Sequence, residues 1–185
     1  MNCLRMLFLA GIVMVVTGVA HAADFTLISP GIKPDGMLTE DQVFNGFGCS
    51  GKNISPALKW TKGPEGTKSY ALTVYDPDAP TGSGWWHWVV YNIPATVTEL
   101  AEGSGDISGK LLPQGAIQGR TDFGTHAFGG ACPPQGDTPH RYIFTVYALK
   151  ADKIDVPADA SAALIGFMIH ANTIEKAQFT AKYGR

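Results

Sequence analysis

Two segments near the middle of the chain carry the hydrophobic pattern of buried β-strands. Apolar and polar side chains alternate in residues 72–75, and residues 88–91 form a continuous run of aromatic and β-branched side chains. Residues 76–87 lie between them and are rich in proline and glycine. The pattern therefore predicts a loop that joins two buried strands.

Strand patterns recur on both sides of this pair. Residues 25–28 predict a short opening strand, and a second short run surrounds Val43 and Phe44. Residues 54–60 return to an alternation of apolar and polar side chains, and residues 141–149 carry the strongest β pattern of the chain. We therefore expect a turn-rich, mainly β protein.

The period of the pattern changes in residues 158–170, which predict a helix. Its apolar stripe consists of Leu164, Ile165, Met168 and Ile169. Asp159 or Ser161 stands where an N-cap residue is expected, and we predict that the helix continues past Asn172. The last residues alternate again, so a short strand over residues 179–183 closes the chain.

The predicted elements are mostly strands, with one helix close to the end. This order is typical of an antiparallel, Greek-key-like fold of two sheets with the C-terminal helix packed outside. Residues 95–119 lack a clear period and predict a long connection. The chain shows no internal repeat and no heptad pattern, which excludes solenoid and coiled-coil architectures.

The first residues have the composition of a cleavable export signal. Arg5 precedes an apolar run over residues 6–16, and residues 20–22 supply the small-residue pattern that signal peptidase recognises. The run is shorter than the ~20 apolar residues of a membrane span, which argues against a retained anchor. We therefore predict a signal peptide over residues 1–22 and one domain over residues 23–185, with no stable membrane anchor after processing.

Charge gives no indication of a nucleic-acid or acidic-membrane partner. The sequence has 14 Lys and Arg residues against 16 Asp and Glu residues, and the predicted signal peptide contains Arg5 but no acid. The exported chain is therefore slightly acidic, with a net charge of about −3. A basic surface for nucleic acid is not expected.

Cysteine usage fits an exported chain. Cys3 leaves with the predicted signal peptide, so Cys49 and Cys132 remain, and both lie in glycine-rich loops. An even pair of cysteines in an oxidising compartment favours a disulfide, and we predict that bond. Two reduced, buried thiols are the alternative that the sequence leaves open.

The loop over residues 76–87 carries the candidate chemistry. Asp76 and Asp78 flank a proline whose ring restricts the backbone, and His87 stands at the entrance of the next strand. A second loop ends at His140, again directly before a strand. If these strands are spatial neighbours, the carboxylate of Asp76 meets both imidazoles.

Such a cluster suits an anion. A carboxylate beside two imidazoles is expected to raise their pKa and to leave ring N–H groups directed into the pocket. The backbone of Gly129 and Gly130 is expected to add N–H donors, as glycine-rich nests do for phosphate. We therefore predict an anion site that needs neither a metal nor a cofactor.

Three other interpretations use the same residues. A plain hairpin loop with structural histidines is common at such positions. A metal-dependent enzyme is the second, although the chain lacks the closely spaced His motifs of zinc sites. A hydrolase is the third, although the chain has no Gly-x-Ser-x-Gly elbow and Cys132 lies in a loop that no helix follows. A binding protein is therefore expected rather than an enzyme.

Two blocks of residues resemble the motifs of the phosphatidylethanolamine-binding proteins, also called Raf-kinase-inhibitor-like proteins. They read DPDAP at residues 76–80 with WHW at 86–88, and GGACPP at 129–134 with HRY at 140–142. Residues 49–60 also resemble the CxGxNxSPxLxW segment of the bacterial members. The resemblance covers most of residues 24–185.

The resemblance implies a two-sheet β fold with a small pocket for phosphate-like groups. Carried over by position, the pocket residues of this chain are Asp76, His87 and His140, surrounded by Asp78, Pro80, Gly130 and Tyr142. Two positions depart from the family pattern. Ala131 stands where the family usually has proline, and Phe128 where it often has tyrosine, so the rim is expected to lose stiffness and one hydroxyl donor.

The resemblance also implies a bacterial, periplasmic protein that binds a small anion or a phospholipid head group. Eukaryotic members bind and inhibit kinases, and some inhibit proteases. A periplasmic chain meets no cytosolic kinase, so that role is not transferred, and the identity of any protein partner stays open. The expected function is binding or inhibition rather than catalysis.

Overall fold

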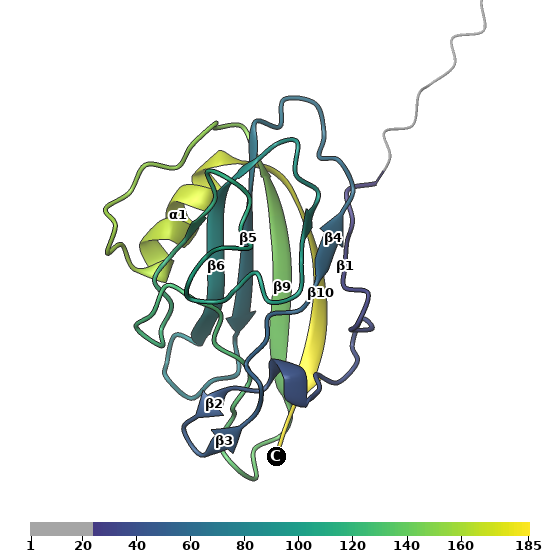
Figure 1. The fold of residues 1–185 in the computed structure, drawn as a ribbon, viewed down its shortest axis with the longest axis vertical. Coiled ribbons are helices and arrows are strands. Elements are labelled where there is room, and N and C mark those ends of the chain that lie inside the picture. The colour runs from purple at the N-terminus through teal and green to yellow at the C-terminus, as the bar shows by residue number, and fades with distance from the viewer. Residues whose placement is uncertain (1–23) are drawn as a thin grey trace, which may run out of the picture.

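The longest apolar alternations of the chain form a central sheet of five antiparallel strands in the order β10-β9-β5-β6-β8 (Figure 1). The structure is a computed structural model that describes residues 24–185, so the predicted signal peptide lies outside the described residues. The strands are β5 (Ser69–Asp76), β6 (Trp85–Pro94), β8 (Ile117–Gln118), β9 (His140–Leu149) and β10 (Thr173–Tyr183). The prediction of a mainly β, antiparallel fold with a C-terminal helix is confirmed.

Both faces of the central sheet are covered, which explains why its inner strands are apolar on both sides. Neighbouring residues of a strand point to opposite faces. Leu72 of β5 and Val90 of β6 belong to one core, whereas Ala71 and Val89 belong to a second core on the other face. The run over residues 88–91 is therefore continuous because each of its side chains enters one core or the other.

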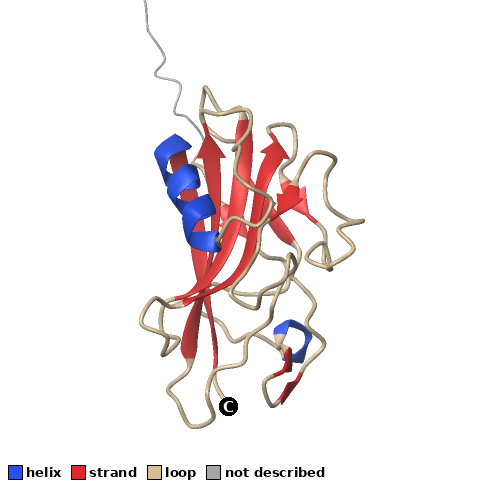
Figure 2. Cartoon of the chain, turned by 90° about the vertical axis from the view of Figure 1, so that its left-hand side faces the viewer, coloured by secondary structure: helices blue, strands red, loops and turns tan. Residues whose placement is uncertain are grey.

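A smaller sheet of three short strands covers one face of the central sheet. Its strands, in the order β1-β4-β7, are β1 (Leu27–Ile28), β4 (Leu58–Trp60) and β7 (Glu99–Leu100). Leu58, Trp60 and Leu100 are buried in the same core as Leu72. Figure 2 shows this sheet and the helix on opposite sides of the central sheet.

The helix α1 (Ala162–Asn172) covers the other face, where Ile165 and Ile169 are fully buried. Of the two predicted caps, Ser161 is the N-cap, and its Oγ accepts the N–H of Leu164 at 3.2 Å. The prediction that the helix continues past Asn172 is wrong. Thr173 is β-branched and extended, and it pairs at once with the free side of β9, so the last strand is longer than residues 179–183.

Three short strand predictions in the first third of the chain need correction. Residues 25–28 and 54–60 give only the two-residue β1 and the three-residue β4, and Pro56 explains the late start of β4 because it has no N–H for pairing. No strand forms at Val43 and Phe44, where Val43 makes a single bridge to Ala131.

A short 3-10 helix and a hairpin flank that bridge. They are η1 (Glu40–Gln42), β2 (Asn45–Gly46) and β3 (Cys49–Ser50). The hairpin lies at the same end of the central sheet as the C-terminus (Figure 1). Among the described residues, no helix is long and apolar enough to cross a lipid bilayer.

Candidate functional site

Strand pairing brings the predicted site residues to one end of the central sheet. Asp76 ends β5 and pairs with Trp85 at the start of β6, while Tyr75 pairs with Ile143 near the start of β9. A cavity of about 160 Å³ lies there. Its lining comprises Phe47, Asp76, Ala79, Pro80, Thr81, Trp85, His87, Phe123, Cys132, Pro133, Pro134, His140 and Tyr142. The structure therefore places Asp76, Pro80, His87, His140 and Tyr142 at one pocket.

Asp76 is the buried carboxylate that organises the loop and one histidine. Its Oδ1 accepts the backbone N–H groups of Asp78 at 2.8 Å and Ala79 at 3.1 Å. Its Oδ2 accepts the Nδ1–H of His140 at 2.8 Å. The carboxylate thus fixes both the turn after β5 and the orientation of the His140 ring.

His140 has a carboxylate at each ring nitrogen. Its Nε2 lies 3.4 Å from Oδ2 of Asp137, which is long for a hydrogen bond. The His140 side chain is buried, whereas the Asp137 side chain is 43% exposed. Asp137 therefore lies at the surface over the one ring nitrogen that Asp76 leaves unused.

His87 is held by the backbone instead of by Asp76. Its Nδ1 lies 2.7 Å from the carbonyl oxygen of Gly129, and Nδ1 must carry the hydrogen because a carbonyl only accepts. Burial lowers the pKa of His87, and this effect outweighs the carbonyl contact and the negative charge of Asp76. The charge of Asp76 raises the pKa of His87 as predicted, but burial lowers it by more, so the expected net increase is wrong for His87.

Tyr142 brings a hydroxyl to the same pocket. Its ring meets the His87 ring edge to face, with centroids 5.0 Å apart. The hydroxyl oxygen is buried and has no hydrogen-bond partner among the described residues. Burial raises the pKa of this phenol, so it remains an O–H donor.

Two predicted pocket residues have structural roles outside the cavity lining. Asp78 binds the Arg141 guanidinium at 2.7 and 2.9 Å and accepts the Arg141 backbone N–H at 2.9 Å. The guanidinium lowers the pKa of Asp78 to about 2. Gly130 is needed for space, because a Cβ there would lie 2.3 Å from the Gln42 carbonyl oxygen.

The expected glycine nest is also absent from this pocket. The N–H of Gly129 donates to the His87 carbonyl at 2.8 Å, and the N–H of Gly130 donates to Oδ1 of Asn53 at 2.6 Å. The Nδ2 of Asn53 donates to the Phe128 carbonyl at 3.1 Å. The two hydrogen bonds of Asn53 therefore hold in place the segment whose Gly129 carbonyl orients His87. This role was not predicted from the sequence.

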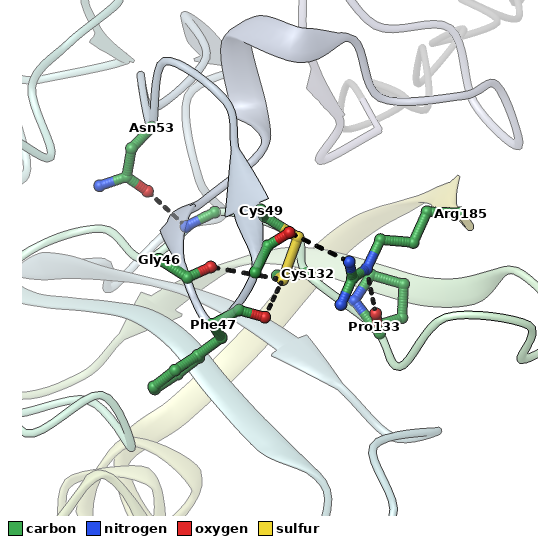
Figure 3. Close-up of a disulfide and its surroundings, with 9 residues drawn as sticks. Gly46, Phe47, Cys49, Asn53, Cys132, Pro133 and Arg185 are labelled. Carbon is green, nitrogen blue, oxygen red and sulfur yellow. Dashed lines mark hydrogen bonds between the residues drawn. A yellow bond between two sulfur atoms is a disulfide. The ribbon is translucent and has the colours of Figure 1, made fainter.

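A disulfide joins Cys49 to Cys132 at the wall of the pocket (Figure 3). The Arg185 guanidinium makes a second link beside it, donating to the carbonyls of Pro133 at 2.8 Å and Gly48 at 3.2 Å. Both links hold the β2–β3 hairpin against the loop before β9. The hairpin tip carries Phe47, which lines the pocket.

The two departures from the family pattern have different effects from those expected. Phe128 lies in the core, where its ring packs edge to face on Trp88 with centroids 5.8 Å apart. Because Phe128 does not line the pocket, phenylalanine in place of tyrosine removes no hydroxyl donor from the pocket lining. The N–H of Ala131 donates to the Gln42 carbonyl at 3.0 Å, a bond that proline cannot make.

Five apolar residues that form the walls of the pocket were not predicted from the sequence. They are Phe47, Trp85, Phe123, Pro133 and Pro134. Trp85 lies next to the WHW motif and the two prolines end the GGACPP motif, whereas Phe47 and Phe123 come from loops with no sequence signal of their own. Within residues 24–185, no group of three or more His, Cys, Asp or Glu side chains is arranged to hold a metal ion.

Known proteins match this chain over nearly all of its described length. A family model for phosphatidylethanolamine-binding protein matches residues 29–184. The Escherichia coli protein YbcL is 54% identical over 180 residues, which cover 97% of this chain and 98% of YbcL. E. coli YbhB is 51% identical over 158 residues, which cover 85% of this chain and 98% of YbhB.

Solved structures agree with the sequence matches. The crystal structure of E. coli YbcL, described as a new member of the mammalian PEBP family, matches with a TM-score of 0.86 and 58% identity, covering 88% of this chain and 99% of that one. A Chlamydia trachomatis homologue, CT736, matches with a TM-score of 0.72 and 28% identity, covering 87% and 97%. On these matches, the chain belongs to the phosphatidylethanolamine-binding protein family.

Proposed function

We propose that this chain is a binding or inhibitory protein whose pocket holds a phosphate-like anion, either a free ion or the head group of a phospholipid. The supporting observation is that His87, His140 and Tyr142 line one small cavity. The Tyr142 hydroxyl carries most weight, because a buried O–H without a partner costs ~1–3 kcal/mol. A bound acceptor would recover that cost.

His87 makes the proposed binding depend on pH. The carbonyl oxygen of Gly129 accepts the Nδ1–H of His87, so only Nε2 remains for a ligand. The lowered pKa keeps the ring neutral near pH 7, where Nε2 is an acceptor, and protonation turns Nε2 into a donor. An anion that binds the imidazolium must raise its pKa, so binding takes up a proton and strengthens as pH falls.

The Nε2 of His140 becomes available when the anion displaces the Asp137 carboxylate. That carboxylate is partly exposed and lies 3.4 Å from Nε2, so its contact is weak. An incoming anion can take the same position once the Asp137 side chain turns to solvent. The ligand then lies between two imidazoles, with Asp76 behind one of them as counter-charge.

The lining also supports binding rather than catalysis. The sulfur of Cys132 is part of a disulfide and therefore supplies no thiolate nucleophile. The carboxylate of Asp76 accepts three hydrogen bonds, from Asp78, Ala79 and His140, so it is a poor candidate for a free general base. No contact of these residues favours the hydrolase alternative.

Calorimetric titration with sulfate tests the anion site, because sulfate keeps its charge between pH 5.5 and 7.5. Wild type should bind more tightly at pH 5.5, and His87→Gln should lose part of that pH dependence. His87→Gln, His140→Gln and Tyr142→Phe should each weaken binding about 10- to 100-fold at pH 5.5, the usual loss for a hydrogen bond to a charged group.

Two results would contradict the proposal. One is sulfate binding that is indifferent to all three substitutions, and the other is binding that is independent of pH. A metal site would show the opposite trend with Zn²⁺ as the probe, since protons compete with metal for imidazole and binding strengthens as pH rises. Far-UV circular dichroism of each variant checks that the fold is retained.

We further propose that the chain is exported to the periplasm and processed after Ala22. The disulfide between Cys49 and Cys132 supports an oxidising location. The intact mass of periplasmic protein should correspond to a chain that begins at Ala23 and lacks two hydrogens at its cysteines. Recovery of the unprocessed chain in the membrane fraction would disprove export in this form.

A further inference from the structure

The β2–β3 hairpin is a part of the pocket wall that the disulfide holds in place. Its two strands have two residues each, and they form a small sheet of their own that does not extend the larger sheets. A hairpin of this length has little stability by itself in water. The Cys49–Cys132 bond joins it to the loop before β9, beside the contact from Arg185 to Gly48 (Figure 3). The position of the hairpin tip is therefore set largely from outside the hairpin.

The turn at the tip of the hairpin is strained. Its two central residues, Phe47 and Gly48, both have a positive φ, 53° and 82°. Two-residue turns of this kind favour Asn-Gly, because a bulky side chain raises the cost of the left-handed conformation. The Phe47 side chain also remains 69% exposed, so its burial returns little stability. Without a link from outside, the tip is expected to open.

The base of the hairpin is anchored independently of the disulfide. The N–H of Phe44 donates to the Ala131 carbonyl at 2.9 Å, and the N–H of Gly51 donates to the Phe44 carbonyl at 3.0 Å. Val43, directly before this base, is buried and makes a bridge to Ala131. Residues 45–50 are therefore able to move as a unit while the chain on either side of them stays in place.

The tip and the disulfide both shape the anion pocket. Phe47 and Cys132 belong to the same lining as His87. The Phe47 ring stacks on Phe123 at a centroid distance of 5.9 Å, and the Phe123 ring meets His87 edge to face at 5.3 Å. Apolar walls keep water from the imidazole, which strengthens a hydrogen bond between that ring and a bound anion. Opening of the tip would remove Phe47 from this wall and admit water.

We propose that the Cys49–Cys132 bond is a redox switch of the anion pocket. The oxidised chain holds the hairpin closed and binds the anion, whereas the reduced chain opens the hairpin and binds weakly. This inference rests on the proposed function of the pocket. It makes formation of the disulfide a condition for tight binding, so the same chain in a reducing compartment binds weakly.

The switch requires a dithiol as reductant and a disulfide as oxidant. Cys49 and Cys132 are both partly exposed, so a thiolate is able to reach the bond. The thiolate attacks one sulfur and forms a mixed disulfide, and the other protein sulfur leaves as a thiolate. The second thiol of the dithiol then displaces the remaining protein sulfur. Two electrons and two protons pass to the protein, which gains two thiols, and the dithiol becomes a disulfide. Oxidation reverses these steps.

Reduction of the folded chain tests the switch. The protein is reduced with dithiothreitol at about pH 8, where the reagent forms its thiolate, and is moved without oxygen to pH 5.5 for calorimetric titration with sulfate. If the reduced hairpin is closed in about one tenth of the molecules, the apparent affinity should fall about tenfold. The double variant Cys49→Ser with Cys132→Ser is the control for the reagent. It should bind as weakly as the reduced chain, with or without dithiothreitol.

Hydrogen exchange follows the hairpin without any ligand. Reduction should speed the exchange of the amides of residues 45–49. The amide of Gly51 should keep its protection, because its partner at the base is the Phe44 carbonyl. Equal exchange of residues 45–49 in the oxidised and reduced chains would show that the hairpin does not open, and would overturn the switch.

Phe47→Asn tests the pocket wall with the disulfide intact. Asn suits the left-handed position of the turn, so the substitution removes the ring and leaves the hairpin unstrained. The oxidised variant should bind sulfate more weakly than oxidised wild type. Reduction should then weaken its binding less than it weakens that of wild type, since the ring is already missing from the wall.

The outcomes separate the switch from the pocket. If the reduced chain binds sulfate as tightly as the oxidised chain, the switch is disproved while the anion pocket stands. A bond that dithiothreitol does not reduce in the folded protein has the same meaning. If far-UV circular dichroism shows that reduction unfolds the chain, the oxidised Phe47→Asn variant decides, and unchanged sulfate affinity there disproves the switch. If the oxidised wild type binds no sulfate, the pocket proposal fails and the switch falls with it.

Discussion

The two loops that close the pocket are held in opposite ways. The loop over residues 77–84 depends mainly on hydrogen bonds between near neighbours in the sequence. Asp76 accepts the N–H groups of the two loop residues described above, and the Tyr75 hydroxyl donates to the Ser83 carbonyl at 2.7 Å. The Thr81 hydroxyl donates to the Gly84 carbonyl at 2.5 Å. Its long-range link is the ion pair of Asp78 with Arg141.

The loop over residues 119–139 depends on partners far away in the sequence. Asn53 binds it across 75 and 77 residues, and the disulfide from Cys49 spans 83 residues. Arg185 reaches it from the C-terminus. Local chemistry therefore shapes the Asp76 side of the pocket, whereas tertiary contacts shape the side that orients His87. The two sides should respond differently to mutation.

Removing the disulfide should give the largest effect. The double variant Cys49→Ser with Cys132→Ser frees a closed loop of 83 residues, which should lower the free energy of unfolding by about 4.5 kcal/mol in the chain-entropy model. Guanidinium denaturation measures this loss. Hydrogen exchange then compares the loops, and the amide of Gly130 should lose protection while that of Ala79 keeps it. Equal loss at both amides would show that the loops are not independent.

Replacing Asn53 should give a smaller and more local effect. Asn53→Gly keeps the left-handed backbone at φ 55° but removes both side-chain hydrogen bonds, which should cost roughly 2 kcal/mol of stability. Because Gly129 then loses its support, sulfate binding at His87 should weaken as well. Denaturation and calorimetry of the same variant measure the two losses.

The matched variant for the other loop is Tyr75→Phe at the end of β5, which should have the smallest effect. It removes one exposed hydrogen bond to Ser83 and should cost about 0.5–1 kcal/mol with sulfate affinity unchanged. If Tyr75→Phe weakens sulfate binding as much as Asn53→Gly does, the distinction between a local and a tertiary side of the pocket is wrong.

The same distinction explains how far the sequence predicted the site. The strand ends could be located from local patterns, so Asp76, His87 and His140 were expected at one place and the structure brings them together. The ion pair of Asp78 with Arg141 and the bond of Gly130 to Asn53 depend on contacts across 63 and 77 residues. Neither contact appears in hydrophobic periodicity, and it was the family resemblance that placed both residues around the pocket.

The errors in the fold have a similar cause. The apolar stripe at Leu164 and Ile165 locates the helix, but its end depends on whether β9 has a free side for Thr173 to pair with. Likewise, the lowered pKa of His87 depends on how deeply the ring is buried, which a nearby aspartate in the sequence does not reveal. Tertiary burial and pairing decide these points, and local propensity does not.

The interior position of β9 in the sheet has a consequence for how the chain folds. β9 pairs with β5 on one side and β10 on the other, and its partner β5 begins 71 residues before it, at Ser69. Such non-local pairing requires large loops to close before the stabilising contacts form, so folding is expected to be slow. Asp76 and His140 meet only through that pairing. The pocket is therefore expected to form late, together with the complete sheet, and a partly folded chain should lack the proposed anion site.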